Sequence, residues 1–145
     1  MTPDVNVLLA AFRTDHPHHG VATRWLRSAL GDVASGRSFV LLPMAVAGFI
    51  RLATHPKVFR EPAPAAAAVA FIDSLLAVPG VETAELGREW PAFSRLLHEH
   101  VAHGNEVPDV WIAAAVQTRG ECLATFDQGF GQLLGRNELI LLRPA

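Results

Sequence analysis

The chain has 145 residues, of which 50% are hydrophobic and 18% are charged, and its formal net charge is −2. This length and composition predict a single globular domain, residues 1–145, and exclude a disordered chain. No apolar run reaches the ~18 residues of a membrane span, and no basic segment leads into an apolar one as in a signal peptide. The single cysteine, Cys122, excludes an internal disulfide, so we expect a cytoplasmic protein without membrane contact. The net charge does not indicate a nucleic-acid partner, but a local basic patch would be enough for one.

Residues 3–9, at the start of the chain, are predicted to form a short strand and its exit. Asp4 and Asn6 alternate there with valines, although aspartate and asparagine are poor strand residues. Two interpretations remain open. The segment is an edge strand or a turn, or its two polar side chains lie on one face of a strand end and point into a cleft.

Helices and strands are predicted to alternate along the rest of the chain, from apolar residues at helical spacing, short apolar runs, and proline or glycine at the boundaries. This alternation predicts an α/β fold, with a mainly parallel central sheet of about four to five strands and helices on both faces. The predicted elements are a loop over 10–20, a helix over 18–30, a strand over 39–42, a helix from 43 to before Pro56, a helix from 64 to Pro79, a strand over 81–83, helices over 89–101 and from 108 to Gly120, a strand over 123–126, a short helix over 130–134 and a strand over 139–142.

Three of the six aspartates stand where strands are predicted to end or helices to begin. Asp4 belongs to the first strand, and Asp127 directly follows the strand over 123–126. Asp109 follows a helix-starting proline, in the first turn, where the helix dipole favours negative charge. If the first and fourth strands are neighbours, the three carboxylates meet at the carboxyl edge of the sheet. Each one alone is explained as a helix-start or turn residue, but the three together favour a site.

Three carboxylates at such close range repel one another and need a counter-charge to stay ionised. A hard divalent cation with oxygen ligands supplies that charge, and Mg²⁺ or Mn²⁺ is the natural candidate. A cation held in this way polarises a phosphoryl oxygen and lowers the pKa of a bound water. Asn6 and Thr125 are placed to orient water or a carboxylate by hydrogen bonding.

Other polar patterns in the chain do not predict a site. Ala102 stands where the zinc-protease helix motif needs its second histidine, so we interpret His98, His100 and His103 as exposed helix-end residues. The glycine-rich segment 129–135 is one residue too long for a dinucleotide-binding fingerprint. The remaining cluster, in the loop over 10–20, is more typical of solvated residues, or of residues near a phosphate-binding surface, than of metal ligands; it consists of His16, His18 and His19.

The sequence resembles PIN-domain ribonucleases, in particular the VapC toxins of bacterial toxin–antitoxin pairs. The resemblance covers essentially the whole chain, in the family's order and at its typical spacing. A further segment, 48–56, resembles a branch of that family abundant in mycobacteria. The motifs that carry the resemblance are Asp4-Val5-Asn6-Val7-Leu8-Leu9, Val107-Pro108-Asp109 with Ile112-Ala113-Ala114, and Thr125-Phe126-Asp127 with Phe130.

The resemblance implies a PIN-like three-layer α/β/α domain that acts as a metal-dependent endoribonuclease on tRNA, rRNA or mRNA. In that family, acidic residues hold one or two Mg²⁺ ions, or Mn²⁺ in their place. By motif match these residues are Asp4, Asp109 and Asp127, with Asn6 and Thr125 in support. The resemblance also implies a homodimer, and a cognate small DNA-binding antitoxin of VapB type whose C-terminal tail blocks the cleft.

Two positions depart from the family pattern. Gly48 stands where most PIN domains carry a glutamate on the second helix, and Gly129 stands where many relatives carry a further acid. Glu106 is a candidate fourth carboxylate, and an exposed helix-start charge is the alternative for it. The missing glutamate leaves open a second function: a catalytically weakened PIN-fold module that binds RNA or protein.

RNA binding requires basic surface beside the acidic cluster, because phosphate contacts supply much of the affinity. Four arginines near the first two predicted helices are candidates, although each also fits a solvated surface: Arg13, Arg24, Arg27 and Arg51. A phosphoreceiver domain is a further alternative. It is disfavoured because the only lysine, Lys57, is far from the last strand.

Overall fold

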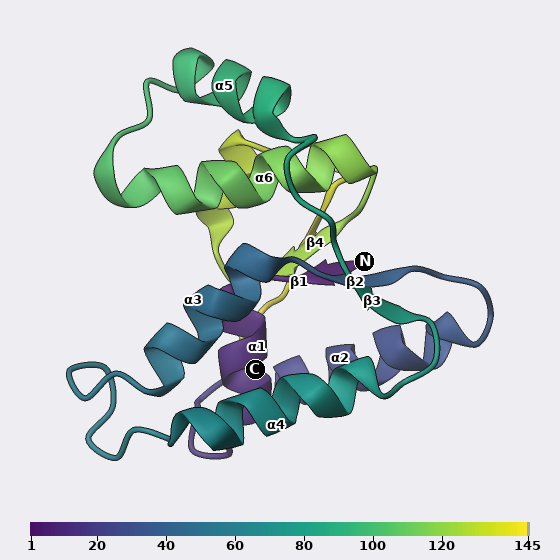
Figure 1. Ribbon diagram of the computed structural model, residues 1–145, viewed down its shortest axis with the longest axis vertical. Coiled ribbons are helices and arrows are strands. Elements are labelled where there is room, and N and C mark those ends of the chain that lie inside the picture. Colours follow the sequence, from purple (N-terminus) through teal and green to yellow (C-terminus); the bar gives the residue numbers. More distant parts are fainter. Residues whose placement is uncertain (145) are drawn as a thin grey trace.

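The computed structural model describes residues 1–144 and places a sheet of short strands between two groups of helices (Figure 1). Helices α5 and α6 lie on one side of the strands, and α2 and α4 lie on the other. The elements are β1 (Thr2–Pro3), α1 (Val5–Phe12), α2 (His19–Val33), β2 (Phe39–Leu41), α3 (Pro43–Ala53), α4 (Ala65–Leu76), β3 (Val81–Thr83), α5 (Trp90–Glu99), η1 (Gly104–Glu106), α6 (Val107–Arg119), β4 (Leu123–Thr125), η2 (Gln128–Gln132) and β5 (Leu139–Leu141), where η marks a 3-10 helix.

The central sheet is parallel in every pairing described for residues 1–144. Strand β4 lies between β1 and β5, and β2 pairs with β3. The two ladders are joined where the backbone N–H of Val40 donates to the carbonyl of Met1 over 2.9 Å. The strand order is therefore β3-β2-β1-β4-β5. Both the parallel sheet and the adjacency of the first and fourth strands, on which the predicted carboxylate cluster depended, are confirmed.

Strand β2 shows how the sheet separates two hydrophobic cores. Phe39 and Leu41 belong to the core shared with α1, α2, α3 and α4, whereas Val40 belongs to the core shared with α5 and α6. Successive side chains of a strand point to opposite faces, so an unbroken apolar run is required where both faces are covered. The three-layer α/β/α architecture is therefore confirmed.

The prediction of a strand over 3–9 and a loop over 10–20 is wrong, because the strand ends at Pro3 and helix α1 occupies Val5–Phe12. Asp4 is the N-cap of this helix, since its side chain accepts a hydrogen bond from the N–H of Val5 over 2.7 Å. The helix is buried on most sides, so its apolar run has no clear helical period and cannot be distinguished from a strand by pattern.

The other predicted elements agree with the structure to within a few residues at their ends. The exception is the short helix predicted over 130–134, where the structure has the 3-10 helix η2 over Gln128–Gln132. This turn begins earlier because the side chain of Asp127 caps it at the N–H of Gly129. Within residues 1–144, no helix is both long and apolar enough to cross a membrane.

Helix α5 ends at a left-handed residue that is not glycine. The N–H of Ala102 donates to the carbonyl of Leu97 over 3.2 Å, and the N–H of Val101 donates to the carbonyl of His98 over 3.4 Å. This pair of bonds is a Schellman motif, in which glycine commonly occupies the left-handed position. Here Val101 occupies it, with φ of 49° and 80% of its surface exposed. A β-branched side chain is strained in this conformation.

Replacing Val101 by glycine is expected to raise the free energy of unfolding by about 0.5–1 kcal/mol. Relief of ~1–2 kcal/mol of left-handed strain exceeds the chain entropy that glycine adds to the unfolded state. Denaturant unfolding measures the change. Val101→Ala is the control, because it keeps a Cβ atom and should gain less. A glycine variant less stable than the wild type would contradict the strain at this turn.

Candidate functional site

The hydroxyl group of Thr125 joins the start of α1 to the turn that follows β4. Thr125 is fully buried, and its Oγ1 donates to Asp4 Oδ2 over 2.6 Å. The same oxygen accepts the backbone N–H of Asp127 over 3.0 Å and the side-chain amide of Asn6 over 3.1 Å. One hydroxyl thus fixes the positions of two acidic residues that are more than a hundred positions apart in the sequence.

Asp4 is a buried carboxylate, with only 4% of its surface exposed. Its Oδ1 accepts the N–H of Val5 and its Oδ2 accepts the hydroxyl of Thr125. Burial raises the pKa of Asp4 from 3.8 to about 6, against the opposing effect of these two hydrogen bonds, and the charges of Asp109 and Asp127 raise it further. A carboxylate has about four acceptor positions, so each oxygen of Asp4 can still accept a further ligand.

Asp109 and Asp127 approach this position from two other elements. Asp109 lies in the first turn of α6, and burial followed by repulsion from Asp127 raises its pKa. Asp127 caps η2 through a 2.7 Å hydrogen bond from the N–H of Gly129 to its Oδ1. The charges of Asp109 and Asp127 act on the pKa of Asp4, and the charge of Asp127 acts on the pKa of Asp109. The fold thus brings the three carboxylates within electrostatic range of one another, and that they form one site stays a prediction.

Two cavities meet at Asp109. The first has a volume of about 210 Å³, and its lining includes Asp109 and Asp127 together with Glu106 and His100. The second, about 550 Å³, lies between α1, α3 and the start of α6, and Arg51 lines it. Asp109 therefore lies between an acidic cavity and a cavity lined by the positively charged side chain of Arg51. Glu106, the candidate fourth carboxylate, lines the acidic cavity.

The donor atoms at this site suit a hard divalent cation. Among the ion pairs of residues 1–144, none involves Asp4, Asp109 or Asp127, so their repulsion is not offset by a salt bridge. Oxygen ligands of this kind match Mg²⁺ or Mn²⁺. In the same described part of the chain, no three acidic, histidine or cysteine side chains are grouped tightly enough to form a ready-made metal site. The oxygen atoms of these side chains are the type of ligand that a divalent cation prefers. The carboxylates would have to move closer together to bind one.

Helices α1 and α3 pack closely at Gly48, the position where the family pattern has an acid. A Cβ atom added to Gly48 would lie 2.9 Å from Cγ2 of Val5, which is the first residue of α1. A side chain at position 48 therefore requires Val5 to move. The departure from the family pattern at Gly48 thus allows α1 and α3 to approach closely.

The four candidate arginines have different environments. Arg13 donates to both carboxylate oxygens of Asp15 over 2.9 and 2.7 Å, and to the carbonyl of Glu61 over 3.1 Å. Its guanidinium is therefore committed within the protein. Arg24 and Arg27 are exposed on α2, and Arg51 is exposed beside Asp109. Of the four, Arg51 lines a described cavity together with Asp109.

The loop that contains His16, His18 and His19 packs against the end of β4, next to the candidate site. The ring of His18 stacks on Phe126, with 4.9 Å between centroids, and the N–H of Phe126 donates to Asn6 Oδ1 over 3.2 Å. His100 is exposed, as expected, but the sequence interpretation did not place it in the acidic cavity. The available signal was the short connection from α5 to α6, which brings the end of one helix beside the start of the next.

Comparison with known proteins identifies the family. Residues 1–133 match the PIN domain family, so the chain belongs to it. Its relatives include the VapC ribonucleases of Mycobacterium tuberculosis. VapC31 is 33% identical over 130 residues, covering 89% of each chain. VapC43 is 35% identical over 131 residues, covering 89% of this chain and 86% of its own.

A solved structure shares the fold of this chain. It is VapBC2 from Rickettsia felis bound to a DNA fragment from the promoter, with a TM-score of 0.67 over 98% of both chains and 15% identity. At this identity the likeness shows the fold alone. The chain is therefore a PIN-domain protein, and its sequence relatives place it with the VapC ribonucleases.

Replacing Asp4 by asparagine is expected to stabilise the protein near neutral pH when no divalent cation is present. The pKa of about 6 exceeds that of the unfolded chain, so ionising this carboxyl opposes folding. The penalty is absent below a pH of 3.8, grows as the pH rises to about 6, and is complete above that, at up to about 3 kcal/mol.

Urea unfolding at about pH 7.5 and about pH 4 tests this dependence, and the gain should disappear at the lower pH. Asparagine can still cap α1. The exposed Asp73 on α4 provides the matched control, because Asp73→Asn should change stability little at either pH. An Asp4 variant that is less stable than the wild type at both pH values would contradict the burial penalty.

Gly48→Ala is expected to destabilise the protein by up to about 2 kcal/mol. Overpacking against Val5 costs roughly 1–3 kcal/mol, which exceeds the helix-propensity gain of about 1 kcal/mol. Thermal or urea unfolding measures the loss. In the double variant Val5→Ala/Gly48→Ala the loss should be smaller than the sum of the two single changes, because they share one contact. Additive changes would show that the contact does not limit position 48.

Proposed function

We propose that this protein is a metal-dependent endoribonuclease and the toxin component of a toxin–antitoxin pair. The observation that carries the proposal is the electrostatic coupling of Asp4, Asp109 and Asp127, which come from three elements and share no salt bridge among residues 1–144. Perturbed pKa values of this kind cluster at functional sites. The VapC relatives, which are named ribonucleases, support the reaction class.

In this proposal, Asp4, Asp109 and Asp127 hold Mg²⁺, or Mn²⁺ in its place, and Glu106 is available as a fourth carboxylate. When bound, the cation polarises a phosphoryl oxygen and lowers the pKa of a water molecule. Thr125 orients the carboxylate of Asp4 through the 2.6 Å hydrogen bond from its hydroxyl, so the ligand keeps one rotamer.

The RNA substrate is proposed to run past the acidic cluster along the cavity that contains Arg51. That cavity is lined by Asp109 and Arg51, so a phosphate next to the cleaved one can meet a guanidinium. Arg24 and Arg27 are exposed on α2 and available for more distant phosphates. The role expected for Arg13 finds less support, because its guanidinium is already paired.

The proposed partner is a small DNA-binding antitoxin of VapB type, and the proposed assembly of the toxin is a homodimer. The structural neighbour from Rickettsia felis is a VapBC2 assembly bound to promoter DNA, and it has the same fold. In this chain an apolar cavity of about 420 Å³, whose lining includes Leu86 and Trp111, continues from the Arg51 cavity through Met44 and Pro108. An apolar surface next to the site suits a protein segment that covers it.

A second function is favoured by one feature, the absence of a carboxylate on α3. A side chain at Gly48 would need Val5 to shift, and no residue of α3 is acidic. A PIN-fold module that binds RNA or protein without cutting is the alternative. It predicts RNA affinity without cleavage at any concentration of Mg²⁺ or Mn²⁺.

Asp109→Asn and Asp4→Asn are each expected to lower RNA cleavage by at least about a hundredfold, since each removes a charged oxygen ligand. Purified protein would be incubated with total RNA and with synthetic single strands in Mg²⁺ or Mn²⁺, and chelator should abolish cleavage. The exposed Asp73→Asn should cleave like the wild type. Cleavage that survives both site substitutions would eliminate the proposed site. RNA binding without cleavage by the wild type would select the alternative.

A further inference from the structure

His100 stands in the acidic cavity without a partner of its own. It is the C-cap of α5, and it lines the 210 Å³ cavity together with Glu106, Asp109 and Asp127. Apart from Gln132, it is the only residue of the cavity lining whose side chain carries an N–H donor. No hydrogen bond is described for its ring within residues 1–144. A donor of this kind can bind an anion beside the acids.

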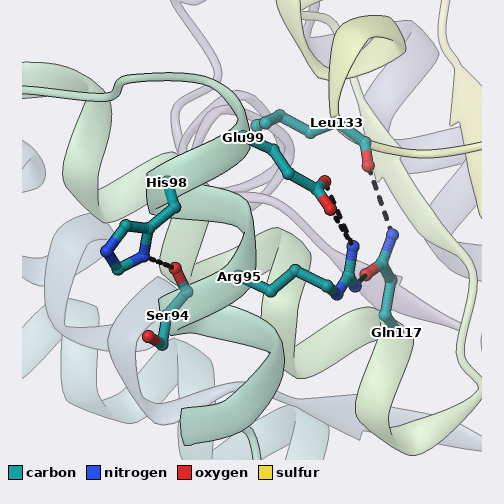
Figure 2. Close-up of polar contacts among 6 residues, drawn as sticks. All are labelled: Ser94, Arg95, His98, Glu99, Gln117 and Leu133. Atoms are coloured by element: carbon teal, nitrogen blue, oxygen red, sulfur yellow. Dashed lines mark hydrogen bonds and ion pairs between the residues drawn. The ribbon is translucent and has the colours of Figure 1, made fainter.

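The rings of the two neighbouring histidines, His98 and His103, already have partners within the protein. Figure 2 shows His98 turned back along its own helix, where its Nδ1 lies 2.7 Å from the carbonyl oxygen of Ser94. His103 Nδ1 lies 3.4 Å from the carbonyl oxygen of Val101 and 3.4 Å from Glu106 Oε1. Three histidines that look alike in the sequence therefore differ in the structure. Of the three, His100 lines the acidic cavity, and no ring hydrogen bond is described for it within residues 1–144.

A polar network holds α5 against α6 and the segment after η2. Arg95 Nη2 donates to Gln117 Oε1 over 2.9 Å, and Gln117 Nε2 donates to the carbonyl oxygen of Leu133 over 3.3 Å (Figure 2). Arg95 also pairs with Glu99 over 3.2 Å. These contacts connect α5, α6 and the residue after η2, and each of these parts contributes to the cavity or to its border. Helix α5, whose C-cap is His100, is thus fixed against the helix that carries Asp109 and the segment that follows Asp127.

We propose that His100 is a substrate-contacting residue, whose ring N–H donates to a phosphate oxygen of the RNA strand beside Asp109 and Asp127. The proposal rests on the ribonuclease function proposed above and adds a contact to its site. Carboxylates repel phosphate, so a strand lying against them needs donors close by. Arg51 supplies one on the far side of Asp109, and His100 supplies one within the acidic cavity. The strand would then be held on both sides of Asp109.

The test compares His100→Ala, His100→Gln and His98→Ala. Glutamine keeps an N–H donor, whereas alanine removes it. His98→Ala is the matched control, because His98 lies on the same exposed helix end but bonds to its own backbone. Affinity for a short labelled single-stranded RNA would be measured by fluorescence anisotropy in chelator, where no cleavage occurs. Steady-state kcat and KM would then be measured with Mg²⁺ or Mn²⁺, and thermal unfolding would show that each variant is folded.

His100→Ala is expected to weaken RNA affinity and to raise KM about three- to tenfold, the size of one hydrogen bond to phosphate. His100→Gln should recover most of the loss, and His98→Ala should match the wild type. An alanine variant that binds RNA like the wild type overturns the proposal, as does an equal loss in His98→Ala or a wild type that binds no RNA. The proposed function fails separately. If the wild type does not cleave RNA but the His100 variants still lose affinity, the contact stands and the cleavage activity does not.

Discussion

The site depends on the parallel pairing of β1 with β4. This pairing places Thr2 opposite Leu123 and Pro3 opposite Ala124, so the next residues, Asp4 and Thr125, meet where both strands end. The buried hydroxyl of Thr125 then binds the Asp4 carboxylate and the backbone of the Asp127 turn. Because the first strand is only two residues long, α1 begins at once and takes Asp4 as its N-cap. One residue therefore ends a strand, starts a helix and supplies a carboxylate to the site.

Electrostatics at this site work against the stability of the fold. Burying Asp4 near two other carboxylates raises its pKa to about 6, which costs up to about 3 kcal/mol at neutral pH, against a typical domain stability of about 5–15 kcal/mol. The large cores on both faces of the sheet can support such a cost. No salt bridge among the described residues offsets this repulsion, and the cation proposed to bind there would remove the penalty.

Sequence patterns predicted most elements, but they failed at α1. A helix buried on most sides has a nearly continuous apolar run, and its valines further suggest an extended chain. The error did not remove Asp4 from the candidate site, because the observed strand ends at Pro3 and Asp4 follows directly at its carboxyl end. From the sequence, the pairing of the first and fourth strands could only be assumed. The hydrogen bonds between residues more than a hundred positions apart needed the assembled sheet.

The sequence by itself determined the α/β class, the order of the motifs and the three acids, because periodicity and helix or strand boundaries are local properties. The tertiary structure alone decided which polar residues share a cavity. Nothing local distinguishes His100 from His98, yet the docking of α5 on α6 places one in the acidic cavity and leaves the other bonded to its own helix. Likewise, the contact between Gly48 and Val5 follows from the close approach of two helices. Close packing fixes such neighbours, and it depends on all the elements at once.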